Sequence, residues 1–115
     1  MTSTRHPINS SLLSLFDDMK VFVDGEISGE GFEYRFVNGN SNVLLPQKED
    51  GSYLGYEAYQ QIFYAVEDYV DDPALRDGPE DLDEDGLRTA VTTAREALWN
   101  ALTSAGYEVP DYVYP

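Results

Sequence analysis

A stretch of nineteen residues, 67–85, concentrates most of the ionisable side chains of this sequence. It contains ten carboxylates and a single arginine, and it supplies nine of the fifteen net negative charges. On a helix that rises about 1.5 Å per residue these residues would span about 28 Å, with one charge per about 3 Å. Phosphates along one DNA strand are about 3.4 Å apart. The segment therefore has the charge spacing needed to imitate a nucleic-acid backbone.

Part of this stretch follows the first half of an EF-hand calcium loop, D-x-[DN]-x-[DN]-G, through Asp81, Asp83, Asp85 and Gly86. The twelfth position of the pattern requires a bidentate glutamate, but Thr92 stands there. Calcium is thus the one cofactor that the sequence suggests, at a degenerate site. In the alternative interpretation the same aspartates cap the following helix and interact with its dipole.

Other kinds of chemistry lack the residues that they need. The chain has no cysteine, and its single histidine, His6, precedes Pro7 near the start of the sequence. A catalytic carboxylic acid needs burial or a close like charge to raise its pKa, whereas most carboxylates here fall on predicted outer faces or loops. We therefore expect no catalytic residues and no enzyme activity.

Length and charge limit the domain organisation and the partners. The chain has 115 residues and a net charge of −15, which predicts one small acidic domain over residues 1–115. Such a charge disfavours direct binding to nucleic acid or to an anionic membrane. It favours a basic protein as partner, above all a nucleic-acid-binding enzyme or complex. The sequence shows neither a signal core nor an apolar run of about 20 residues, so we expect a cytoplasmic protein.

The first half of the chain predicts one helix followed by strands. Apolar residues recur at helical spacing over 10–19, after a cap at Asn9 or Ser10. From Lys20 the pattern changes to a period of two, which predicts strands at 20–27, 31–37 and 42–45. Asn38 and Gly39 are typical of a tight type I′ hairpin turn.

The second half predicts two amphipathic helices, at 53–72 and 83–105. We therefore expect an α+β fold: a short N-terminal helix, a three-stranded antiparallel meander, and two helices packed on one sheet face. Residues 1–9 and 107–115 are predicted to be flexible or peripheral. The acidic stretch is then divided between the end of one helix, a connection and the start of the next.

Candidate partner-binding residues are those that have no evident local structural role, together with one tyrosine predicted to face outward. They are Glu57, Tyr64, Glu67, Asp68, Asp71, Asp72, Asp77 and Glu80.

These features favour a non-enzymatic inhibitor or binding protein that presents carboxylates to a basic, nucleic-acid-binding protein. In size and acidity the chain is similar to the small DNA-mimic inhibitors that phages direct against restriction or CRISPR machinery, without sharing a motif with them. One alternative is an immunity protein that neutralises a basic toxin or nuclease. Another is an acidic domain of a salt-adapted organism that carries the degenerate calcium loop, residues 81–86.

Overall fold

The computed structural model describes residues 5–40, 42–70, 72–76, 78 and 81–114. Within this part of the chain the α-helices are α1 (Ser10–Val23), α2 (Gly29–Arg35), α3 (Tyr56–Asp68) and α4 (Glu84–Ser104). The shorter elements are the π-helix η1 (Phe36–Asn40), the 3-10 helix η2 (Pro73–Leu75), and the strands β1 (His6–Pro7) and β2 (Tyr107–Glu108), which pair in parallel. The predicted α+β fold with a three-stranded antiparallel meander is therefore wrong, because the protein is mostly helical.

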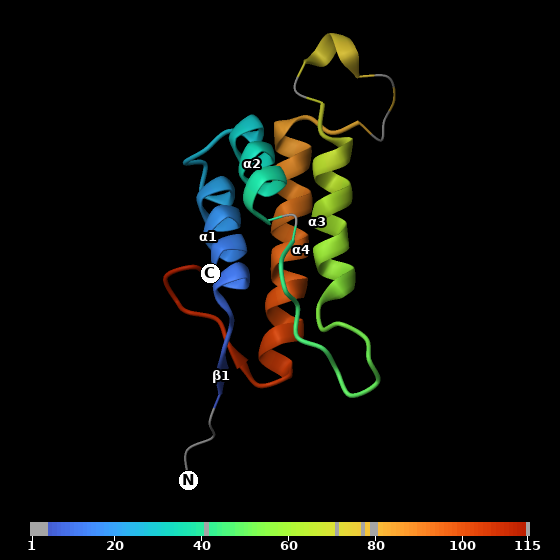
Figure 1. Ribbon diagram of the computed structural model, residues 1–115. Coiled ribbons are helices and arrows are strands. Elements are labelled where there is room, and N and C mark those ends of the chain that lie inside the picture. The colour runs from blue at the N-terminus through green and yellow to red at the C-terminus, as the bar shows by residue number, and fades with distance from the viewer. Residues whose placement is uncertain (1–4, 41, 71, 77, 79–80, 115) are drawn as a thin grey trace.

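Helix α4 lies at the centre of the bundle, with α3 on one side and α1 and α2 on the other (Figure 1). Its inward face is a stripe at helical spacing that is completely buried: Leu87, Val91, Ala94, Leu98 and Leu102. The predicted helix 83–105 and its apolar stripe are confirmed. Gly106, two residues after the end of α4, has a φ of +90°, so a residue without a Cβ suits the turn there.

Helix α1 is longer than its predicted range. The side chain of Asn9 accepts a hydrogen bond from the Leu12 backbone N–H at 3.0 Å, which confirms the predicted cap. The predicted strand at 20–27 is wrong, because residues 20–23 continue the helix. Phe22 follows Met19 by three residues and is equally buried, so the helical stripe extends by one turn. Lys20 also pairs with Asp24 at 2.8 Å, at the i,i+4 spacing of a helix surface.

The predicted strand at 31–37 is also wrong, and helix α2 and η1 occupy this segment. Phe32 and Phe36 are buried while Tyr34 is 69% exposed, so the buried residues are spaced by four and not by two. Ser28 caps α2 by accepting a hydrogen bond from the Gly31 N–H. The predicted turn at residues 38–39 does not form a hairpin, since both residues belong to η1.

Residues 42–45, the third predicted strand, are not part of a sheet. The segment runs between α1 and α3 (Figure 1), and hydrogen bonds tie it to the start of α1. The Asn9 side chain donates to the Leu44 carbonyl at 2.8 Å, and the Leu44 N–H donates to the Ser11 hydroxyl at 3.0 Å. The backbone C=O and N–H of Leu44 thus bond to side chains and not to a neighbouring strand.

A line of aromatic rings crosses the core from α1 to α3. The rings of Phe22 and Phe32 stack with centroids 4.8 Å apart, and Phe36 follows at 6.2 Å from Phe32. Phe36 in turn contacts the rings of Tyr59 and Phe63 on α3, each at 6.0 Å. Pairs at these separations stabilise a fold beyond their buried area. The line thus joins α1, α2, η1 and α3 in one core.

The first turn of α4 braces the two N-terminal helices. Glu84 Oε1 accepts a hydrogen bond from the Gly29 backbone N–H at 2.6 Å, at the start of α2. Arg88 Nε donates to the Phe22 carbonyl at 3.2 Å, and its guanidinium lies 4.8 Å from the centre of the Phe22 ring. The first contact gives the first N–H of α2 an acceptor that its own helix cannot supply. The second adds a donor to a carbonyl that also accepts from the Gly25 N–H at 3.0 Å.

The chain after α4 returns to the bundle and packs against it. Val113 is completely buried, and Arg95 Nη2 donates to its carbonyl at 3.3 Å. The ring of Tyr114 lies between the Arg95 guanidinium, 4.5 Å from its centre, and the ring of Trp99, whose centroid is 5.0 Å away. The C-terminal segment therefore closes one side of the core.

The Glu84 brace predicts a measurable loss of stability. Replacing Glu84 with alanine leaves the Gly29 N–H without this acceptor, and we expect it to lower the free energy of unfolding by about 1 to 2 kcal/mol in urea denaturation. The matched control is Asp85→Ala, since Asp85 also lies in the first turn of α4 but its side chain is 93% exposed. An equal loss in the two variants would contradict the brace.

Candidate partner-binding surface

Helix α3 is held on α4 by close packing at its start. Gly55 has a φ of +75°, and a Cβ there would lie 2.5 Å from Leu98 Cδ1, so both the backbone conformation and the space require glycine. Ala58, Ile62 and Val66 are buried, as the predicted stripe requires. The opposite face of α3 points away from the core. Its ends lie inside the predicted range of 53–72.

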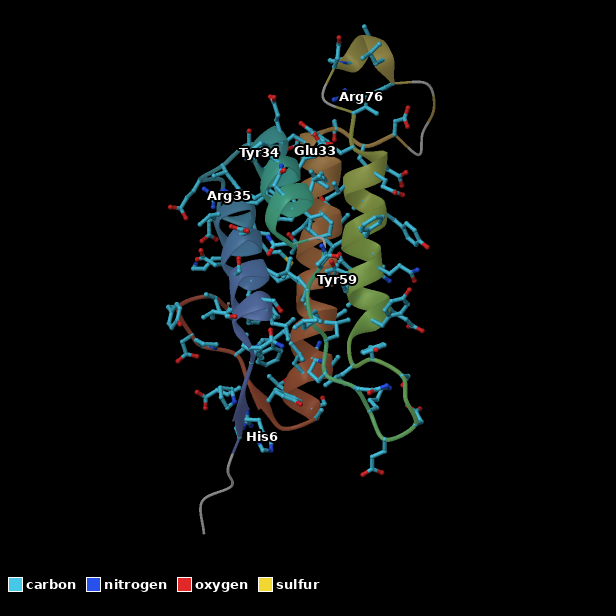
Figure 2. The ribbon with its side chains drawn as sticks, in the orientation of Figure 1. His6, Glu33, Tyr34, Arg35, Tyr59 and Arg76 are labelled. Carbon is cyan, nitrogen blue, oxygen red and sulfur yellow. The ribbon has the colours of Figure 1, made fainter. Side chains whose placement is uncertain are left out.

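Between α3 and α4 the chain leaves the bundle, and backbone hydrogen bonds join the two ends of this connection. The Leu82 N–H donates to the Asp68 carbonyl at 2.8 Å, and the Val70 N–H donates to the Leu82 carbonyl at 2.9 Å. Helix η2 lies in this connection, outside the end of the bundle (Figure 1), and Arg76 lies below it, with Nε bonded to the Val70 carbonyl at 2.9 Å (Figure 2). The end of α3 and the start of α4 therefore lie side by side.

Four of the acidic residues predicted as partner-binding or calcium-binding have identifiable structural roles. Asp83 caps α4 by accepting from the Gly86 N–H at 2.7 Å, as the capping interpretation of this motif predicts. Asp72 caps η2, Asp85 lies 3.4 Å from Arg88, and Glu57 lies in the first turn of α3, where the helix dipole favours an anion.

The remaining predicted residues fall into two groups. Asp71, Asp77 and Glu80 lie outside the described residues. Glu67 and Asp68 are exposed and occupy the last turn of α3. A negative charge at a helix C-terminus is unfavourable by about 0.3 to 1 kcal/mol. Neither carboxylate forms an ion pair with another described residue. These two side chains therefore have a structural cost and no structural use that the described contacts show.

The arginines near these helices form hydrogen bonds to the backbone of the fold. Arg76, Arg88 and Arg95 each donate to a backbone carbonyl inside the fold. Burial lowers the pKa of Arg95, with a smaller opposing effect from Tyr114. Helix α3 itself contains no lysine or arginine. Its outer face therefore carries carboxylates without neighbouring cations from its own element.

The calcium interpretation gains no support from the geometry. Among the described residues no group of three carboxylate or histidine side chains is arranged to hold a metal ion. Asp83 is engaged as a cap, and Asp81 and Asp85 do not join it in such a group. Calcium binding at Asp81, Asp83 and Asp85 stays a prediction.

Aromatic side chains lie between the carboxylates of α3. Tyr64 is 52% exposed, in agreement with its predicted outward position. Gln60 Nε2 donates to the Tyr64 hydroxyl at 2.9 Å and lies 3.4 Å from the Tyr56 hydroxyl. Tyr56 is 50% exposed as well, so Gln60 lies between two tyrosines at the surface of α3. Sequence reasoning missed Tyr56, although its spacing of eight residues from Tyr64 placed both on one face.

Tyr59 on α3 (Figure 2) connects this face to the end of η1. Its hydroxyl donates to the Asn40 carbonyl at 2.6 Å. Burial raises the pKa of the Tyr59 phenol above its usual value of 10.0. Phe63, predicted to point inward, is 38% exposed, so the aromatic line of the core reaches the surface beside Tyr59.

Because Glu67 and Asp68 lie at the negative end of the helix dipole, we expect the double variant Glu67→Gln/Asp68→Asn to be more stable than the wild type. Removing two anions from the C-terminal turn of α3 is expected to raise the free energy of unfolding by about 0.3 to 1 kcal/mol at low salt. Glu57→Gln, in the first turn of the same helix, is the control and should lower it slightly. Thermal denaturation measures the stability of both variants. A double variant less stable than the wild type would contradict the unfavourable interaction with the helix dipole.

A further prediction concerns the Tyr59 hydroxyl. Tyr59→Phe loses the hydrogen bond to Asn40 and should lower the free energy of unfolding by about 0.5 to 1.5 kcal/mol at neutral pH. Because the pKa of Tyr59 is raised in the folded state, the wild type loses stability as the pH rises above 10. The variant lacks this loss. Chemical denaturation at neutral and alkaline pH should show the gap between the two proteins narrowing, and a constant gap would contradict the burial effect.

No helix in the described part of the chain has the length and apolar character needed to cross a membrane. Comparisons of the chain with protein-family models, with curated proteins and with solved structures find no match.

Proposed function

We propose that this protein is a non-enzymatic acidic inhibitor that uses the outer face of α3 to bind a basic, nucleic-acid-binding protein. The observation that carries the proposal is the pair Glu67 and Asp68, which are exposed and lie at the end of α3 where the helix dipole opposes them. Such a cost is typical of functional residues, for which stability is given up.

Charge placement supports binding to a basic surface in particular. The hydrogen bonds that join the two ends of the connection between α3 and α4 bring the end of α3 beside the acidic first turn of α4, so carboxylates from two helices lie at one end of the bundle. Complementary charge accelerates association and suppresses wrong partners. The face therefore suits a protein whose groove normally holds phosphates, as in the restriction or CRISPR complexes that DNA-mimic inhibitors block.

Binding is favoured over catalysis because the carboxylates of α3 are exposed. General acid catalysis needs a carboxyl group shielded from solvent or placed against a like charge. We also propose a cytoplasmic location, where basic nucleic-acid-binding enzymes work and where a chain without cysteine needs no oxidising compartment.

The proposal is tested with the immobilised protein and a fraction of host proteins eluted from DNA-cellulose. Capture should fall between about 50 and about 500 mM salt, as expected for a contact made through charge. An excess of duplex DNA should release the captured protein. Glu67→Gln/Asp68→Asn should weaken capture strongly at low salt.

The control variant Asp17→Asn/Glu96→Gln removes the same number of charges from exposed positions on α1 and α4. It should capture nearly as well as the wild type. Capture that persists at the highest salt, resists duplex DNA, or responds equally to both variants would remove the hypothesis of a nucleic-acid mimic.

A further inference from the structure

A shallow groove follows α3 and is made of three adjoining depressions. The first, of about 280 Å³, lies between the segment 43–45 and Tyr53. The second, of about 270 Å³, is lined by Gln60 and Tyr64, and shares Tyr56 and Tyr59 with the first. The third, also of about 270 Å³, lies beside η1 and shares Phe63 with the second. The shared residues place the three depressions next to one another along α3.

The walls of this groove are apolar and exposed. The exposed fractions are 71% for Leu44, 56% for Val37, 51% for Tyr53, 50% for Tyr56 and 52% for Tyr64. Contiguous exposed apolar surface marks interaction sites in monomeric proteins. Tyrosine in particular is enriched among the residues that contribute most to binding.

Charge lies at one end of the groove. The residues that line it opposite α3 are 36–37 and 43–45, which carry no charge, and α3 contains no cation. Glu67, in the last turn of α3, lines the third depression, whereas Glu57 lines a different depression together with Lys48. An apolar floor thus ends at a carboxylate.

We propose that the groove binds a segment of the partner in which apolar side chains lie beside a cation. This inference rests on the proposed function and names the part of the partner that is recognised. The arginine or lysine of this segment would pair with Glu67, and its apolar side chains would enter the depressions. Arginine can also stack on the exposed tyrosine rings.

Other occupants fit the groove less well. A second copy of this chain would bring another fifteen net negative charges to a surface that already carries them. A nucleic acid would add phosphates beside carboxylates. A purely cationic segment would leave the apolar walls exposed to water. A segment that carries both apolar side chains and a cation satisfies both the apolar walls and Glu67.

The experiment uses two labelled synthetic peptides. In the first, two pairs of arginines flank an alternating leucine and serine segment; in the second, serine replaces each leucine, so the charge is equal. Fluorescence anisotropy with the full chain should show binding of the leucine peptide about tenfold tighter than that of the serine peptide. Tyr64→Ala and Leu44→Ser should each remove most of this advantage.

The control variants are Tyr34→Ala and Tyr112→Ala, which truncate tyrosines exposed by 69% and 67% on α2 and on the C-terminal segment. They should bind both peptides like the wild type. Circular dichroism checks the fold of each variant, and Leu44→Ser carries the test if Tyr64→Ala does not fold.

The outcomes separate the two proposals. Equal binding of the two peptides, with loss only in Glu67→Gln/Asp68→Asn, would overturn the groove and leave the proposed function intact. Binding of neither peptide at low salt would overturn both. A dimer in sedimentation experiments that dissociates on Tyr64→Ala would assign the groove to a second copy and overturn the inference.

Discussion

The fold depends on the line of aromatic rings that starts at Phe22 and ends at Phe63. Phe32 and Phe36 lie at its centre, four residues apart, where α2 and η1 turn both rings toward the core. The same line determines the surface. Because Phe36 packs against both Tyr59 and Phe63, it holds η1 close to α3 and creates the wall of the groove. Core packing and the candidate interface thus share residues.

Electrostatics divides the acidic side chains into two kinds. Those at the start of α4 stabilise helix ends, and Glu84 does so across the bundle by binding the first N–H of α2. Glu67 and Asp68 lie at the wrong end of α3 for such a role. The sparse arginines reinforce the division, since Arg88 and Arg95 bond to carbonyls within the fold and do not neutralise the α3 face. The net charge of −15 is therefore structural in part and available for binding in part.

The sequence was sufficient for the long helices and not for the middle of the chain. Helix α4 was predictable because its cap, Asp83, and its apolar stripe point to the same element. Residues 20–37 are rich in valine and phenylalanine, which favour strands locally. The helical state wins there through contacts with distant residues: Glu84 with Gly29, and Arg88 with the Phe22 carbonyl. No local pattern reveals such contacts.

The candidate site, like the fold, was predictable from the sequence only in part. The outward position of Tyr64 and the exposure of Glu67 and Asp68 follow from helical periodicity alone. The groove does not, because its other wall comes from η1 and from residues 43–45, which were assigned to strands. Tyr56 and Leu44 line the same depression because of the path that the chain takes between α1 and α3, and the sequence does not reveal that path.

The central claim is that the outer face of α3 contacts a basic partner, and site-specific photocrosslinking tests it most directly. A photoreactive phenylalanine derivative is placed at position 64 or, as the comparison, at position 112, and the protein is irradiated in an extract of its host. The account predicts a crosslink from position 64 to a basic nucleic-acid-binding protein, lost when duplex DNA is added. A crosslink from position 112 alone, or one from position 64 that duplex DNA leaves unchanged, would contradict it.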